Sequence, residues 1–359
     1  MLEVVRLGVI GLRRGLNVVK EVANEPGVVI TAVCDRKPEA VANAVKILGN
    51  RGVCDLKTYE NFEEFLTGPI DAVYIATDAT DHVSYVMKAL AAGKHVLSEI
   101  PAVSSLEEAH LLRQAVESHP ELKYMAAENC FYWNFIEAWK KMYEAGKLGT
   151  TVYAEAEYLH SRDYREIQTK NLPEGHWRRF FPAIKYITHD LGPLLHIMDD
   201  RCVSVSCMVP DVCYNANKTL EAQNGVALFK TAKGAVIRIL ICFGAYVSLD
   251  HNYRIIGTKG SLQTDLDRPL NDAHTFARFD DIPGSIEKLV EIPVTTSAGK
   301  TTSGHGGADK KMMLDFVRCI REDTKSPIDV DMGIRMVIPG IIAAQSSAQG
   351  GAVLEIPDL

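Results

Sequence analysis

The feature that most constrains the fold is a regular alternation of strand-like and helix-like segments over the first 127 residues. The strand-like runs are short and mostly apolar, and they cover 4–10, 28–34, 72–76, 95–98 and 122–127. Helix-like segments lie between them, at 17–24, 38–48, 62–66, 82–92 and 105–118. Ser105 and Glu108 form a capping box at the start of the last helix. Strands that alternate with helices in this way predict a parallel, doubly wound sheet.

The pattern changes after about residue 150. Strand-like runs now follow one another, at 151–159, 203–209, 225–230, 235–243 and 254–256. Ala232-Lys233-Gly234 and Thr258-Lys259-Gly260 are typical of turns between antiparallel strands. Two further helices are predicted, at 310–321 and 335–348.

The length of 359 residues is more than one hydrophobic core comfortably serves, so we expect two domains. Residues 1–127 are predicted to form an α/β domain with a doubly wound parallel sheet. Residues 128–359 are predicted to form an α+β domain with an open, mainly antiparallel sheet. We expect the last helix of this second domain to pack back against the first.

Charge and composition narrow the class of protein. The formal net charge of −7 argues against a nucleic-acid partner and against an anionic membrane surface. The N-terminus has no basic segment followed by an apolar one, so we expect a cytoplasmic protein. The eight cysteines form no C-x-x-C pair, which favours reduced core cysteines. No metal-ligand spacing stands out among the histidines and carboxylates, so we expect no metal site.

A glycine loop follows the first predicted strand. Gly11-Leu12-Arg13-Arg14-Gly15 is one residue shorter than the G-x-G-x-x-G dinucleotide fingerprint and lacks its middle glycine. Its position at a strand-to-helix turn still favours a pyrophosphate at the helix N-terminus. Asp35 ends the next strand, where an acid binds a ribose diol and favours NAD, although Arg36 beside it suits the 2′-phosphate of NADP. Two interpretations of Arg13 and Arg14 stay open: contacts to the pyrophosphate, or solvated loop charges.

Further motifs carry a family resemblance over nearly the whole chain. They are Ala76-Thr77-Asp78-Ala79-Thr80-Asp81-His82, Gly93-Lys94-His95-Val96, Glu99-Ile100-Pro101, Glu128-Asn129, Ala145-Gly146-Lys147-Leu148-Gly149 and Ile256-Gly257-Thr258-Lys259-Gly260. This text resembles the superfamily of glucose–fructose oxidoreductase, inositol dehydrogenase and MocA (Gfo/Idh/MocA). The resemblance implies a Rossmann domain, NAD(P)-linked chemistry on sugars or polyols, and a homo-oligomer paired through the open sheets. It adds Ala76, Thr77, His82 and Glu99 to the expected cofactor site. Asn129, which follows a strand of the cofactor domain, is expected to face the nicotinamide or the sugar.

Two departures from the family pattern bear on the reaction. The lysine of the family's Glu-Lys-Pro is Ile100, and the histidine of its Asp-x-Gly-x-His is Leu194, while the aspartate remains as Asp190. Oxidising an alcohol needs a hydride acceptor and a general base for the hydroxyl proton. Lys185 and His189 stand four residues apart and would share one face of a helix. We therefore predict His189 and Lys185 as the acid–base groups, with Asp190 in support.

The text around these residues, Tyr186-x-Thr188-His189-x-Leu191-Gly192-Pro193, resembles a branch of the superfamily that includes NAD-dependent glycosidases. The predicted function is oxidation of a ring hydroxyl, the 3-hydroxyl, of a sugar or glycoside. The alternatives are a redox-neutral, NAD-dependent glycoside hydrolase and a non-catalytic sugar-sensing or nucleotide-sensing regulator. Pro193 makes an unbroken helix doubtful, and we expect His196 to be structural.

Four more residues are candidates for binding the sugar. His160 lies on a strand, Trp177 and Arg178 lie in a loop, and His305 stands between glycines. Tryptophan stacks on pyranose faces, and arginine and histidine recognise hydroxyls. The alternative for each of them is a surface or packing role.

Overall fold

The structure is a computed structural model that describes residues 2–161, 172–211, 223–247, 250–264, 275–292, 294 and 304–359. The chain forms two compact units. Unit 1 contains Met1–Tyr132 and Lys300–Ile334, and unit 2 contains Trp133–Gly299 and Arg335–Leu359. The predicted boundary at residue 127 describes only the first passage between the units, because the helix expected at 310–321 belongs to unit 1 and not to the second domain.

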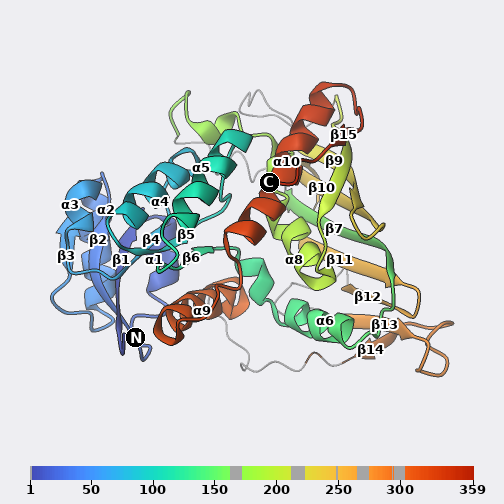
Figure 1. Cartoon of the computed structure of the whole chain (residues 1–359), viewed down its shortest axis with the longest axis horizontal. Helices are drawn as coiled ribbons and strands as arrows, with labels where there is room; N and C mark the ends of the chain where they lie inside the picture. The colour runs from blue at the N-terminus through green and yellow to red at the C-terminus, as the bar shows by residue number, and fades with distance from the viewer. Residues whose placement is uncertain are drawn as a thin grey trace. The chain divides into compact units, whose positions relative to one another are not determined.

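Unit 1 contains the predicted parallel sheet (Figure 1). Its described strands lie in the order β3-β2-β1-β4-β5-β6, and every pairing is parallel. They are β1 (Val5–Ile10), β2 (Val28–Cys34), β3 (Lys57–Tyr59), β4 (Ala72–Ile75), β5 (His95–Ser98) and β6 (Tyr124–Ala126). The strand order reverses between β1 and β4, and in open parallel sheets ligands bind outside the carboxyl ends of the strands at such a switch point.

Helices cover this sheet, with α4 and α5 side by side and α1 against α9. The helices of unit 1 are α1 (Arg14–Val19), α2 (Pro38–Gly49), α3 (Phe62–Leu66), α4 (His82–Ala91), α5 (Leu106–Glu117) and α9 (Ala308–Glu322). Short 3₁₀ turns add η1 (Ala79–Asp81), η2 (Asn129–Tyr132) and η6 (Gly304–Gly307). The Ser105 hydroxyl caps α5 by accepting the Glu108 N–H at 3.1 Å, as predicted, although the Glu108 carboxylate reaches back to the Ser104 N–H.

Unit 2 contains a mixed sheet in which the described strands follow the order β14-β13-β12-β11-β7-β10-β9-β8-β15. All of its pairings are antiparallel except β7 with β10, which confirms the expected fold class. The strands are β7 (Thr151–Ser161), β8 (Cys202–Met208), β9 (Asn224–Thr231), β10 (Val236–Ala245), β11 (Asp250–Gly257), β12 (Gly260–Thr264), β13 (Thr275–Phe279), β14 (Val290–Ile292) and β15 (Leu354–Glu355).

Helix α8 (Thr188–Met198) packs on β7 and is continuous through Pro193, where the sequence made an unbroken helix doubtful. Proline has no N–H to donate to the carbonyl four residues earlier, which is that of His189. The Tyr253 hydroxyl of β11 donates a hydrogen bond of 2.6 Å to this carbonyl. A side chain of the sheet therefore satisfies the acceptor that the proline leaves in the helix.

The remaining helices of unit 2 are α6 (Asn134–Glu144), η3 (Trp177–Arg179), η4 (Ala183–Tyr186) and most of α10 (Val330–Ala348). Among the described residues, no helix has the length and apolar character needed to cross a membrane.

Candidate active site

The glycine turn after β1 is closed too tightly for any residue other than glycine. Gly11 has φ +87°, and a Cβ there would lie 2.2 Å from the Ala76 carbonyl oxygen. The Asp35 carboxylate accepts the Leu12 N–H at 2.8 Å and the Lys37 N–H at 3.0 Å. The two expected elements of a dinucleotide site, the loop and the acid after β2, are thus tied together.

The ends of β4 and β5 add polar groups to the same edge of the sheet. The Thr77 hydroxyl is buried, and no residue in the described part of the chain forms a hydrogen bond with it. The buried His82 ring has Nδ1 2.9 Å from the Pro101 carbonyl oxygen and Nε2 3.3 Å from the Thr77 carbonyl oxygen. An orphan hydroxyl beside the glycine turn fits a polar ligand at the carboxyl ends of the strands.

The two arginines of the glycine loop differ in their surroundings. Arg13 is exposed. Arg14 donates from Nε to Glu99 at 2.8 Å and from Nη2 to Asp309 at 2.7 Å, so its guanidinium is bound by two carboxylates. This is a third arrangement beside the two that the sequence left open. Arg36 lies 4.0 Å from Asp78, and both of these side chains are exposed.

Asp309, at the start of α9, is the centre of the network around Arg14 and is 2% exposed. It also accepts the Asn129 side-chain amide at 2.8 Å and lies 3.0 Å from Nδ1 of His305. Burial alone would raise the pKa of Asp309, but the hydrogen bonds from His305 and Arg14 hold it well below the usual carboxyl range. The carboxylate therefore stays ionised, which fixes the ring of His305.

Tyr74 of β4 donates a hydrogen bond to the Glu99 carboxylate. Its burial, and then the charge of Glu99, raises the pKa of Tyr74 well above its ordinary value. Tyr74 thus remains a neutral donor that holds Glu99 beside Arg14. The network brings together Arg14, Glu99, Asn129 and His305, which the sequence analysis had named separately, with Asp309, which it had not.

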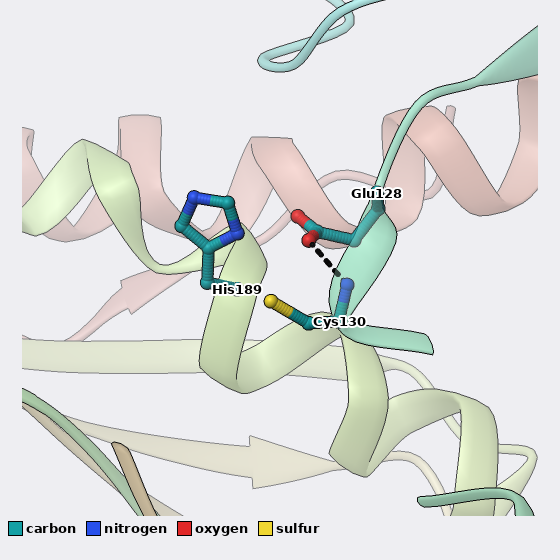
Figure 2. A group of neighbouring side chains, drawn as sticks. All are labelled: Glu128, Cys130 and His189. Atoms are coloured by element: carbon teal, nitrogen blue, oxygen red, sulfur yellow. Dashed lines mark hydrogen bonds between the residues drawn. The ribbon is translucent and has the colours of Figure 1, made fainter. Parts of the chain in front are cut away.

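Glu128 and Cys130, which are both buried, follow β6 (Figure 2). The Cys130 N–H donates to the Glu128 carboxylate at 3.2 Å, and the Cys130 thiol lies 3.5 Å from the Asn129 side-chain oxygen. These contacts hold η2 in place and thereby the Asn129 amide that reaches Asp309.

In unit 2 the central contact joins α8 to β11. Oδ1 of Asp190, on α8, lies 3.0 Å from Nδ1 of His251, on β11. The ring of His251 stacks on that of Tyr158 with 4.0 Å between centroids, and the ring of His189 meets the Tyr158 edge at 5.3 Å. Two histidines, an aspartate and a tyrosine therefore form one cluster, which we call the α8–β11 cluster.

Lys185 does not share a helix with His189. It lies in η4, which ends at Tyr186, and α8 begins at Thr188. Its ammonium group lies 5.6 Å from the centre of the Phe181 ring. The prediction of a Lys185–His189 pair assumed that both residues lie on one face of a single helix. The structure places them in two different elements.

The predicted sugar-binding residues of unit 2 lie in aromatic surroundings. The Arg178 guanidinium covers the Trp177 ring at 4.6 Å and donates to the Tyr186 hydroxyl at 3.2 Å. His160 is buried on β7 with its ring 4.7 Å from Tyr158. The other face of β7 carries Glu155 and Glu157, which bind Arg238 of β10.

The fold and these sites define a class: a two-unit protein that combines a parallel sheet of the dinucleotide-binding type with a mixed sheet that contributes to the α8–β11 cluster. Residues 5–127 match the model of an oxidoreductase family with an NAD-binding Rossmann fold, and residues 136–263 match the GFO/IDH/MocA C-terminal domain. The chain belongs to the Gfo/Idh/MocA superfamily, and unit 1 contains its NAD-binding domain. Residues 217–359 also match the C-terminal domain of glycosyl hydrolase family 109.

Relatives and solved structures agree with this placement. A glycosyl hydrolase family 109 protein of Solibacter usitatus is 29% identical, over 99% of this chain and 88% of its own length. One of Porphyromonas gingivalis is 27% identical, over 99% of this chain and 85% of its own length. A levoglucosan dehydrogenase solved with NADH and L-sorbose has a TM-score of 0.84 at 18% identity, covering 99% of this chain and 100% of that one. The scyllo-inositol dehydrogenase of Lactobacillus casei, solved with NAD(H) and scyllo-inositol, has a TM-score of 0.78 at 19% identity, with 98% and 99% covered. At these sequence identities the two structures are evidence for the fold alone.

Proposed function

We propose that the protein is an NAD-dependent oxidoreductase that oxidises a ring hydroxyl, the 3-hydroxyl, of a sugar or glycoside. The observation that carries the proposal is the α8–β11 cluster: a chain with an NAD-binding domain also holds His251 against the buried Asp190, with His189 close by against Tyr158. Proton exchange at a hydroxyl requires such groups, and hydride transfer requires the cofactor.

The residues of unit 1 suit the cofactor. The turn at Gly11 and the Thr77 hydroxyl would face the pyrophosphate side, and Asp35 would bind the ribose. Each Asp35 oxygen already accepts one backbone N–H and keeps room for a second donor. This supports NAD over NADP. The bound nicotinamide supplies a hydride acceptor in its oxidised form.

The residues of unit 2 suit a sugar. Trp177 offers an aromatic face, and Arg178 and Tyr186 offer hydrogen-bond donors beside it. Lys185 remains a candidate for hydroxyl recognition, without the helical pairing to His189 that first suggested a base.

A second function is favoured by the match of residues 217–359 to the glycosyl hydrolase 109 domain and by the relatives of that name. In a redox-neutral hydrolase the same oxidation would be transient. The hydride would return to the sugar after loss of the aglycone and addition of water.

One experiment separates these functions. The purified protein with NAD is given inositols, free and anhydro sugars, and p-nitrophenyl glycosides, and the reduced-nicotinamide absorbance near ~340 nm is followed. Rising absorbance with a product two hydrogens lighter supports the dehydrogenase. Released nitrophenol at constant absorbance favours the hydrolase. NAD binding without either product would contradict both and favour a regulator.

A further inference from the structure

The pairing of Asp190 with His251 is the best-defined acid–base arrangement in unit 2. The Asp190 side chain is fully buried, and that of His251 is 11% exposed. Their 3.0 Å contact fixes the imidazole from a helix on one side and a strand on the other. A carboxylate at Nδ1 favours the tautomer with its proton on Nδ1, which leaves the lone pair on Nε2.

Aromatic neighbours hold the ring plane. Tyr158 stands directly opposite His251 in the β7–β11 register, and their planes differ by 23°. The Trp133 ring meets His251 at 5.2 Å. His251 is thereby held in one orientation, as a group that exchanges a proton at a defined point requires.

In the part of the chain that the structure describes, the titratable groups seen to face His251 are Asp190 and His189 of α8 and Tyr158 of β7. The rings of His189 and His251 are 6.1 Å apart and nearly perpendicular. His189 has a backbone carbonyl held by Tyr253, while its ring meets the Tyr158 edge. The Asp190 carboxylate thus orients His251, which the sequence analysis did not name.

We infer that His251 is the general base for the reacting hydroxyl and that Asp190 is its positioning residue; this inference rests on the proposed function. As the carbonyl forms, the hydroxyl O–H bond breaks and its proton passes to Nε2 of His251. Oxidised nicotinamide, when bound, would supply the acceptor for the electron pair of the neighbouring C–H bond, which would leave as hydride. The imidazolium is stabilised by the Asp190 carboxylate, and His189 contributes binding contacts to the sugar.

The first test compares His251→Gln, Asp190→Asn and His189→Gln on a substrate that the wild type turns over. We expect His251→Gln to lower kcat about 100-fold or more, with KM within about threefold, and to remove the rise of kcat with pH. Asp190→Asn should also lower kcat, because an amide no longer selects the Nδ1–H tautomer. His189→Gln should mainly raise KM. His196→Gln, on the same helix, is the matched control and should retain wild-type kinetics at pH 7.5.

Chemical rescue separates a catalytic role from a structural one. Added imidazole should restore part of kcat to His251→Ala and none to His189→Ala. Rescue of His189→Ala instead, or wild-type kcat in His251→Gln, would overturn the assignment.

The second test needs no turnover. Imidazole ¹H–¹³C signals of the full chain are assigned with the same two glutamine variants and followed during titration with scyllo-inositol, L-sorbose and levoglucosan. We expect the His251 signal to shift with at least one sugar, and to lose that shift in Asp190→Asn. A shift without NADH formation would count against the dehydrogenase function but not against the sugar contact at His251. Absence of any shift, with every sugar, would overturn the inference.

Discussion

Among single residues, Gly11 carries the clearest steric constraint. Its Cβ-free backbone at φ +87° lets the turn approach the Ala76 carbonyl. Gly93 also has a positive φ, +71°, but a Cβ there would meet nothing within 4 Å. A comparison of the two glycines therefore separates two contributions to the free energy of unfolding: the strain of a left-handed backbone, present at both, and a steric clash of the Cβ, present only at Gly11.

We predict that Gly11→Ala destabilises the protein by about 2 kcal/mol or more and weakens NAD binding at least about tenfold. Gly93→Ala should cost about 1 kcal/mol and leave NAD affinity unchanged. Urea unfolding and calorimetric titration with NAD measure the two quantities. Equal NAD affinities in the two variants would show that the turn does not shape the cofactor site.

Asp309 is the residue on which the charge network of unit 1 depends. Asp309→Asn would remove one of the two carboxylates that bind Arg14. Removing one member of a buried ion pair typically costs about 3 kcal/mol. Asp323→Asn is the matched control, since this exposed acid follows the same helix and pairs with Lys123 at the surface. We expect this change to leave the urea midpoint close to that of the wild type, because solvent screens an exposed ion pair. Similar urea midpoints for both variants would contradict the ascribed role of the buried network.

Among the elements, α8 shows where the sequence was informative and where it was not. The β-branched run at 28–34 and the short strand at 95–98 formed at the predicted residues. Pro193 made an unbroken helix doubtful in the sequence, but its effect depends on whether another group binds the carbonyl that the proline leaves without its N–H. That group is the Tyr253 hydroxyl, which is 60 residues away in sequence and could not be predicted locally.

The cluster around α8 could not be predicted in full for the same reason. Strand β11 was predicted only at 254–256, because its polar first half hides the pattern of an apolar strand. His251 lies in that half, and only the β7–β11 register brings it to Tyr158 and Asp190. Period-two alternation from His251 to Tyr253 and Ile255 was the available signal.

A double-mutant cycle tests how α8 tolerates its proline. Tyr253→Phe should cost about 1 kcal/mol in the wild type, because it removes the hydroxyl donor that binds the His189 carbonyl. In a Pro193→Ala background the alanine N–H supplies that donor, so the same change should cost less by about half. Urea unfolding of the four proteins gives the coupling. Additive effects would mean that Tyr253 and Pro193 act independently.

The end of α8 makes stability depend on pH. Burial, and then the charge of Lys140, lowers the pKa of His196 to about 4. The unfolded chain takes up this proton near pH 6.5, whereas the folded chain does not until about pH 4. Stability should therefore fall as the pH falls from 6.5 to 4, by on the order of 2 kcal/mol for this group.

In His196→Gln the pH dependence of unfolding should flatten over that window. His110→Gln, an exposed histidine on α5, is the control for the loss of an imidazole. Urea midpoints at half-unit steps of pH measure the slopes. A His196→Gln slope equal to that of the wild type would locate the effect elsewhere.

On the scale of the whole molecule, the main feature is that unit 1 is built from two distant pieces of chain. Lys300–Ile334 supplies α9, whose Met312, Met313 and Phe316 are fully buried. The same segment brings Asp309 to Arg14. The parallel sheet was predictable from local periodicity. Its last covering helix, α9, lies in sequence between the two segments of unit 2, and no local sequence pattern shows that it packs in unit 1.

We predict that residues 1–132 alone fail to unfold cooperatively and fail to bind NAD. Joining residues 300–334 to them through a flexible glycine–serine linker should restore both, because α9 returns its buried side chains and Asp309. Denaturation followed by near-ultraviolet circular dichroism, with NAD titration, measures the difference. If residues 1–132 behaved like the joined fragment, α9 would not be part of the folding unit.

Because unit 1 consists of two separate segments of the chain, it also determines the order in which the protein can fold during synthesis on the ribosome. At about 5–20 residues per second, the segment that completes unit 1 is translated on the order of ten seconds after Tyr132. Until then the nascent sheet lacks α9, and the apolar surface that α9 covers stays open to chaperones. The part of the protein that is made first therefore waits for a segment made much later, and β7 to β14 of the mixed sheet are translated in between.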